Sequence, residues 1–143
     1  MKSMFAAFVI AVTLLATVAL AQTDPVTVFR QAIDARNRGD IAAMMALFTD
    51  DAVRDDNSCQ PPCVGLDAVR RSFQKNIDEH FKANVTSVEG ADDTVTARAE
   101  ISNDALRAQG VEKRMTSYTI KLRDGKIARW SSPLPPQTPA KTD

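Results

Sequence analysis

The spacing of apolar residues changes once along this chain, and this change restricts the folds that it can adopt. In the first half, apolar residues recur every three or four positions, most clearly over residues 66–77, which is the period of an amphipathic helix. From Phe81 onward the period is two, and over residues 94–102 apolar and polar residues alternate, as in a half-buried strand. This order predicts an α+β fold with about three N-terminal helices on a strongly curved, mainly antiparallel sheet.

Residues that favour helix ends set the limits of the expected helices. Asp24 and Pro25 suit a helix start, and Gly39 suits a helix stop. Asp40 can cap a second helix, whose apolar residues must be largely buried. The three helices are expected over residues 25–38, 41–48 and 66–79.

Turn signals divide the second half of the chain into strands. Gly90, Gly110 and Gly125 fall between apolar runs, and Asp124-Gly125 is a favoured hairpin turn. A loop is expected over residues 57–64, and a bend with a frayed helical turn between residues 103 and 110. Strands are expected around Val53 and over residues 81–88, 94–102, 111–123 and 126–132.

Both ends of the chain differ from the domain between them. Residues 1–21 combine an early Lys2, a long apolar run and the small-x-small end Ala19-Leu20-Ala21, which predicts a secretory signal peptide cut before Gln22. The alternative is an uncleaved membrane anchor, but the apolar run is short for a bilayer. Residues 133–143 are rich in proline and are expected to form a disordered tail. One domain, residues 22–132, lies between, and the expected location is the periplasm or the exterior.

Charge and cysteine content restrict the partners and the chemistry. The chain has 18 Lys plus Arg and 18 Asp plus Glu with no dense basic run, so nucleic acid is not an expected partner. In an oxidising compartment, Cys59 and Cys63 are expected to form one local disulfide. The alternative is a redox-active or metal-binding pair, although the spacing is not C-x-x-C. His80 is the lone histidine and is interpreted as a helix-end residue, so neither a metal site nor a cofactor is predicted.

Three short motifs occur in an order typical of one superfamily. These are Asn37-Arg38-Gly39-Asp40, Leu47-Phe48-Thr49-Asp50-Asp51-Ala52 and Arg123-Asp124-Gly125-Lys126-Ile127. In their order and spacing the chain resembles the nuclear transport factor 2-like superfamily, and within it the SnoaL-like and ketosteroid-isomerase-like branch. The resemblance implies a cone of helices and curved sheet, a ligand pocket inside the cone and commonly a homodimer. It does not imply one reaction.

Counting from Asp50-Asp51-Ala52, the resemblance places the catalytic Asp of the ketosteroid isomerases on Asp56. Their oxyanion-binding Tyr falls on Ala32, and their oxyanion-binding Asp falls near Tyr118. Asp56 is therefore the candidate general base, with Asp55 as an alternative and a solvated turn carboxylate as the simpler interpretation. Tyr118 is the candidate hydrogen-bond donor, or else a tyrosine of the core.

Four apolar residues are predicted to line the pocket, although packing in the core is an alternative for the Met and the Trp among them. They are Met44, Phe73, Ile120 and Trp130. Arg98 and Arg114 lie on expected strands and could bind an anionic ligand if turned inward, but Arg98 is expected to face solvent or a partner subunit.

The sequence thus predicts an exported domain that binds a small, mostly apolar molecule in its cone, with cofactor-free acid/base chemistry of the isomerase, cyclase or lyase type as an extension. The alternative is a non-catalytic binding or dimerisation module whose cone is closed by its own side chains. Whether the protein is an enzyme stays open at this point.

Overall fold

The computed structural model describes residues 23–133. The predicted signal peptide lies outside the described residues, and so does the predicted tail apart from Pro133. Within residues 23–133 no helix is long and apolar enough to cross a membrane.

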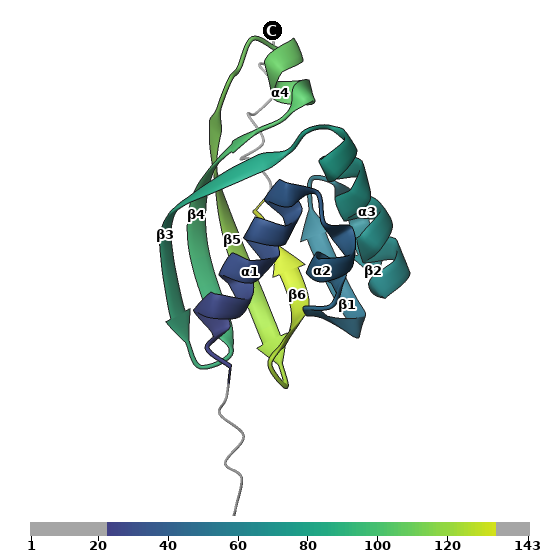
Figure 1. Cartoon of the computed structure of the whole chain (residues 1–143), viewed down its shortest axis with the longest axis vertical. Coiled ribbons are helices and arrows are strands. Elements are labelled where there is room, and N and C mark those ends of the chain that lie inside the picture. The colour runs from purple at the N-terminus through teal and green to yellow at the C-terminus, as the bar shows by residue number, and fades with distance from the viewer. Residues whose placement is uncertain (1–22, 134–143) are drawn as a thin grey trace, which may run out of the picture.

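The described residues form helices that pack on one six-stranded sheet (Figure 1). The helices are α1 (Pro25–Arg38), α2 (Ile41–Met45), α3 (Leu66–Asp78) and α4 (Asp104–Ala108). The strands are β1 (Phe48–Asp56), β2 (Cys59–Val64), β3 (Lys82–Ala91), β4 (Thr94–Ser102), β5 (Arg114–Arg123) and β6 (Lys126–Ser131). The strand order is β2-β1-β6-β5-β4-β3, and only the β1–β6 pair is parallel.

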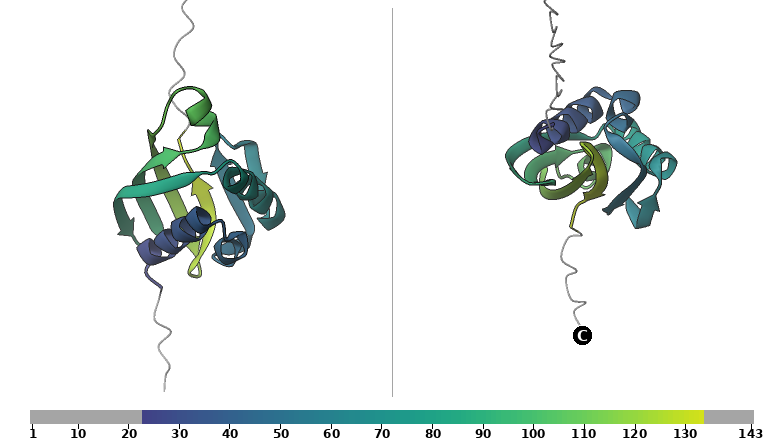
Figure 2. Two further views of the ribbon diagram at one scale, coloured as in Figure 1. Left: turned by 45° about the horizontal axis from the view of Figure 1, so that its top comes forward. Right: turned by 90° about the horizontal axis from the view of Figure 1, so that it is seen from below.

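The sheet curves strongly around α1, so that helix and sheet together form a cone (Figure 2). α1 packs on β3 and β4, whereas α3 packs on β1 and β2. α4 lies in the connection between β4 and β5, at the end of the cone where α1 finishes. The predicted α+β fold, with helices on one face of a mainly antiparallel sheet, is confirmed.

Local capping explains why α1 has the limits predicted from the sequence. The Asp24 carboxylate accepts a hydrogen bond from the Thr27 amide at 3.1 Å, and Gly39 ends the helix with a positive φ of 73°. The second helix, however, ends earlier than predicted. Phe48 pairs with Ile127 of β6 instead of continuing α2, because the parallel β1–β6 ladder takes its backbone into the sheet.

Residues 59–64 were expected to form a loop, but they form β2, an edge strand paired only with β1. The strand contains Pro61 and Pro62, which normally count against a strand assignment. An edge position allows them, because their missing N–H groups would face solvent rather than a neighbouring strand.

The interior of the cone is filled by aromatic side chains. Trp130 of β6 is completely buried, and its ring centroid lies 5.3–6.0 Å from four other aromatic rings. Those rings belong to Phe29, Phe48, Phe73 and Tyr118. They come from α1, β1, α3 and β5, so this aromatic core joins three neighbouring inner strands of the sheet, β1, β6 and β5, to two helices.

Gly90 was predicted to mark a break between strands, but it lies within β3. A Cβ atom at this position would come within 2.8 Å of Cγ2 of Val26 on α1. We expect Gly90→Ala to lower the free energy of unfolding by about 1–3 kcal/mol, because the β-branched valine has few rotamers in which to move aside. Urea denaturation measures the effect. Val26→Ala should relieve most of it in the double variant, and an unchanged midpoint for Gly90→Ala alone would contradict the close approach.

Candidate functional site

The last residues of β1 alternate between the two faces of the sheet. Arg54 and Asp56 are buried on the inner face, with 2% and 6% of their surfaces exposed. Asp55 lies on the outer face, where it accepts a hydrogen bond from Nη2 of Arg129 at 2.8 Å. Asp56, and not Asp55, therefore faces the interior of the cone.

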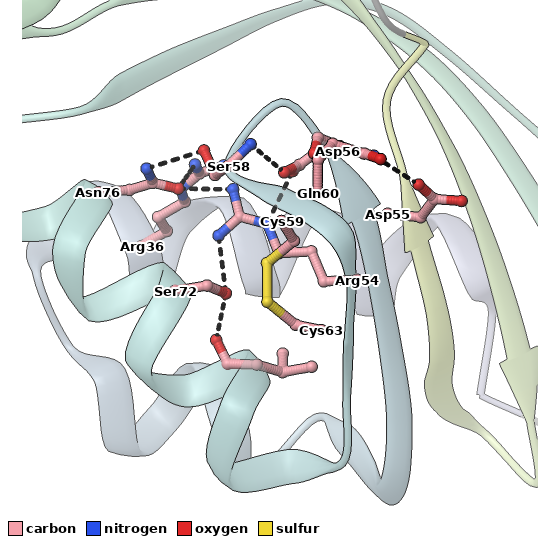
Figure 3. A network of polar contacts seen from close by, with 11 residues as sticks. Arg36, Arg54, Asp55, Asp56, Ser58, Cys59, Gln60, Cys63, Ser72 and Asn76 are labelled. Atoms are coloured by element: carbon pink, nitrogen blue, oxygen red, sulfur yellow. Dashed lines mark hydrogen bonds and ion pairs between the residues drawn. A yellow bond between two sulfur atoms is a disulfide. The ribbon is translucent and has the colours of Figure 1, made fainter.

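Arg54 is the centre of a buried polar network (Figure 3). Its Nε donates to Oδ2 of Asp56 at 2.7 Å, its Nη1 to Oγ of Ser72 at 3.1 Å, and its Nη2 to Oδ1 of Asn76 at 2.6 Å. The guanidinium carbon also lies 3.9 Å from the centroid of the Phe73 ring. Burial lowers the pKa of Arg54, and the neighbouring Asp56 carboxylate opposes this shift.

Arg36 is a second buried guanidinium, and it lies on the inner face of α1. Its Nη2 donates to Oδ1 of Asn76 at 2.7 Å, and its guanidinium carbon lies 3.6 Å from the centroid of the Phe81 ring. Its Nε and Nη1 atoms are buried without a hydrogen-bond partner. Desolvation lowers the pKa of Arg36 to about 10, so the side chain remains charged at neutral pH.

The turn between β1 and β2 holds the Asp56 carboxylate from the other side. The Ser58 amide donates to Oδ1 of Asp56 at 2.8 Å, while Oδ2 accepts from Arg54. The predicted disulfide between Cys59 and Cys63 is present directly after this turn. Both cysteines belong to β2, and they pair with Asp56 and Arg54 of β1 in the antiparallel ladder, so the disulfide has a structural position beside the polar network.

Because both cysteines are joined, thiol titration of the unfolded, unreduced protein should detect no thiol group. Cys59→Ser/Cys63→Ser should lower the free energy of unfolding by about 2 kcal/mol, since the ring that the disulfide closes is short. Chemical denaturation with and without a reductant measures this: reductant should destabilise the natural protein and leave the double variant unchanged. Two reactive thiols in the unreduced protein would contradict the structure.

Tyr118 reaches the same region from β5. Its side chain is buried, and burial raises the pKa of its phenol, with the nearby Arg36 guanidinium opposing the shift. Tyr118 is also packed against Phe29 and Trp130 of the aromatic core. Its ring therefore packs in the aromatic core, and Tyr118 is also one of the residues that line a neighbouring cavity.

This cavity has a volume of about 230 Å³ and lies where α1 and α3 end and β5 begins. Its walls are mainly polar and include Arg36, Arg54, Asp56, Asn76, Arg114 and Tyr118. The two candidate catalytic residues, Asp56 and Tyr118, thus face one cavity, although they come from strands that are distant in sequence.

The four residues predicted to line the pocket lie elsewhere. Met44, Phe73, Ile120 and Trp130 are all completely buried in the core, and none of them borders the cavity. The prediction assumed an open cone, whereas the large aromatic rings of the core fill the middle of the cone. The cavity described above lies at the end of the cone where α1 and α3 finish, and its walls are polar.

Arg36, Arg54 and Asn76 were missed as site residues, but each occupies a position that the periodicity marks as buried. Arg36 follows Phe29 by seven residues in α1, and Asn76 follows Phe73 by three in α3, spacings that keep residues on one helix face. Arg54 shares a strand face with Asp56. Polar residues at such positions are informative, because buried charges are uncommon.

The remaining candidates lie away from this network. His80 is an exposed residue after α3, and its Nδ1 lies 2.7 Å from Oδ2 of Asp104. Arg98 is exposed on β4, as expected, and Arg114 lies at the exposed edge of the cavity. Within residues 23–133 there is no cluster of three or more His, Cys, Asp or Glu side chains that could hold a metal ion.

Comparison with known families decides the classification. The profile of the SnoaL-like domain matches residues 29–130, which is most of the chain. The chain belongs to the SnoaL-like domain family. This SnoaL-like domain is thereby a member of the nuclear transport factor 2-like superfamily, as its motifs predicted. A search of curated proteins finds no match to its sequence.

Solved structures similar to this SnoaL-like domain share its fold at low sequence identity. A suggested polyketide cyclase from Sinorhizobium meliloti has 23% identity, with 75% of this chain and 94% of that chain covered and a TM-score of 0.65. A suggested ketosteroid isomerase from Kribbella flavida has 14% identity, with 83% and 82% covered and a TM-score of 0.65. A protein of unknown function from Cytophaga hutchinsonii has 14% identity, with 79% and 91% covered and a TM-score of 0.65. These likenesses show the fold alone.

Proposed function

We propose that this SnoaL-like domain binds a small molecule in the polar cavity at the end of its cone. The observation that carries the proposal is the gathering of buried Arg36, Arg54, Asp56 and Tyr118 around one cavity. Buried charged groups are costly unless they are paired. A cluster of them around a cavity is therefore better explained by a ligand than by stability.

The size and lining of the cavity restrict the ligand. At about 230 Å³, the cavity is smaller than the roughly 300–1,000 Å³ of typical drug-sized sites. The aromatic core closes the cone beneath it, so a large apolar ligand such as a polycyclic one has no room there. The ligand that fits is small and has a polar group.

A ligand screen by thermal shift tests the proposal, because a molecule that binds only the folded state raises the melting temperature. The informative comparison is between the natural protein and Thr116→Trp, which fills the cavity from β5. Thr119→Trp on the exposed face of the same strand is the matched control. Ligands should stabilise the natural protein and Thr119→Trp but not Thr116→Trp. Ligands that stabilise all three proteins equally would exclude the cavity as the binding site.

A second candidate function is cofactor-free proton transfer, of the isomerase, cyclase or lyase type. The observation that favours it is that Asp56 and Tyr118 line the same cavity, where a base and a hydrogen-bond donor could meet one substrate. The Asp56 carboxylate already accepts two hydrogen bonds, from Arg54 and Ser58, so we place binding before catalysis. Once a substrate is found, Asp56→Asn should abolish turnover, and unchanged turnover would remove Asp56 from the mechanism.

Export and dimerisation are part of the proposal. The N-terminal sequence supports export, and so does the disulfide, because disulfides persist in oxidising compartments. N-terminal sequencing of the protein recovered from the periplasm or medium should begin at Gln22. Sedimentation equilibrium should give twice the mass of the chain that begins at Gln22. A cytoplasmic protein that begins at Met1, or a monomer at all concentrations, would refute these two points separately.

A further inference from the structure

The buried charges around the cavity do not balance. Arg36 and Arg54 are both 2% exposed, whereas Asp56 is the only buried carboxylate among residues 23–133. At the edge of the cavity, Arg114 and Glu79 add one charge of each sign, and Lys75 lies 3.9 Å from Glu79. The buried network itself therefore carries one excess positive charge.

That excess charge belongs to Arg36. Arg54 forms the ion pair with Asp56, but Arg36 forms no ion pair with any of the described residues. It donates one hydrogen bond, to Oδ1 of Asn76, and that neutral oxygen is shared with Arg54 at 2.6 Å. Two cations thus share one uncharged acceptor, and Nε and Nη1 of Arg36 have none. The neighbouring Tyr118 phenol opposes the lowering of the Arg36 pKa by burial, but it is not a carboxylate.

An unpaired buried cation is costly, and within residues 23–133 no carboxylate forms an ion pair with Arg36. The contacts of Arg36 with the Phe81 and Phe73 rings, at 3.6 and 5.0 Å, are weaker than a hydrogen-bonded carboxylate would be. Arg36 and Tyr118 both border the cavity, and Arg114 lies at its edge. An anion that enters the cavity would meet hydrogen-bond donors from α1 and β5.

We infer that the ligand of the cavity is a small carboxylate with a single negative charge, which neutralises Arg36. This inference rests on the proposed function, since it names the class of molecule that the cavity binds. A single charge matches the excess charge of the network, whereas a phosphate dianion would exceed it. The guanidinium group also matches the geometry of a carboxylate. The apolar part of such a ligand would be limited to about the size of one ring.

Calorimetric titration with sodium benzoate and with benzamide, its neutral analogue, tests the inference at constant ionic strength. Benzoate should bind at least tenfold more tightly than benzamide. Arg36→Met, which keeps the bulk of the side chain but removes its charge, should weaken benzoate binding at least tenfold. Arg38→Met is the matched control, because it removes one exposed charge from the end of the same helix, and it should bind benzoate as the natural protein does.

Other outcomes would overturn the inference in different ways. If benzamide binds as tightly as benzoate, and Thr116→Trp abolishes both, the cavity is a binding site but not one for anions. If inorganic phosphate binds more tightly than benzoate, the assignment to a carboxylate is wrong. If a broad ligand screen and both probes give no binding, the proposed function fails as well. The comparison of benzoate with benzamide uses only the natural protein, so it decides even if Arg36→Met does not fold.

Discussion

Replacing Asp56 with alanine should lower the free energy of unfolding by about 3–5 kcal/mol, which is the usual effect of breaking a buried ion pair from one side. The reason is that the variant removes the carboxylate that pairs with Arg54 and leaves Arg54 and Arg36 as two buried, unpaired guanidinium groups. Urea denaturation of the natural protein and of Asp56→Ala measures the difference. The matched control is Asp55→Ala, the neighbouring residue with its half-exposed partner Arg129, and it should cost only about 0–1 kcal/mol.

The double variant Arg54→Met/Asp56→Ala distinguishes the contribution of the ion pair to stability from that of the other contacts in the network. Removing both charges leaves no unpaired partner of the pair, so the double variant should be more stable than Asp56→Ala alone. Equal destabilisation by Asp55→Ala and Asp56→Ala would show that Asp56 is solvated. Asp56 would then not be the buried partner of Arg54, and the described network would be wrong.

Trp130→Ala should lower the free energy of unfolding by about 3–5 kcal/mol, because it removes the ring on which the aromatic core packs. Four other rings lie within 6.0 Å of Trp130, measured between centroids. Met115→Ala on β5 is a suitable control, since Met115 is 45% exposed, and its effect should stay within about 0.5 kcal/mol. Denaturation should be monitored by far-UV circular dichroism for both variants. Trp130 is the only tryptophan of the chain, so Trp130→Ala has no tryptophan fluorescence that could report its unfolding.

The same variant distinguishes a closed cone from an open one. A cavity lined by apolar side chains can bind an apolar molecule of matching shape, so indole should raise the melting temperature of Trp130→Ala. It should not bind at this position in the natural protein, because the Trp130 ring occupies that space in the aromatic core. Stabilisation of the natural protein by indole at the Trp130 position would restore the apolar pocket that the sequence predicted.

The sequence predicted the fold well because its signals are local. The limits of α1 follow from Asp24 and Gly39, and β4 follows from strict alternation over residues 94–102. Errors occurred where tertiary pairing overrides local preference. Phe48 joins β1 because Ile127 is available in β6, and residues 59–64 form an edge strand despite two prolines.

The candidate site was harder to predict because it depends on side chains that meet only in three dimensions. Counting along the chain identified Asp56 and Tyr118, and both border the cavity. The other members of the network could not be identified that way. Ser72 and Asn76, which accept hydrogen bonds from Arg54, lie on α3, and Arg36, which also donates to Asn76, lies on α1. Whether the cone is open depends on how Phe29, Phe48, Phe73 and Trp130 pack, and no linear pattern specifies that.

The central claim is that a small carboxylate binds in the cavity beside Arg36, above the aromatic core. The most direct measurement is a crystal structure of the protein grown with 4-bromobenzoate, in which anomalous scattering locates the bromine. We expect one bromine peak inside the cavity, with the carboxylate in hydrogen-bond distance of Arg36. A peak only on the surface, a ligand whose carboxylate points away from Arg36, or an empty cavity at saturating ligand would contradict the claim.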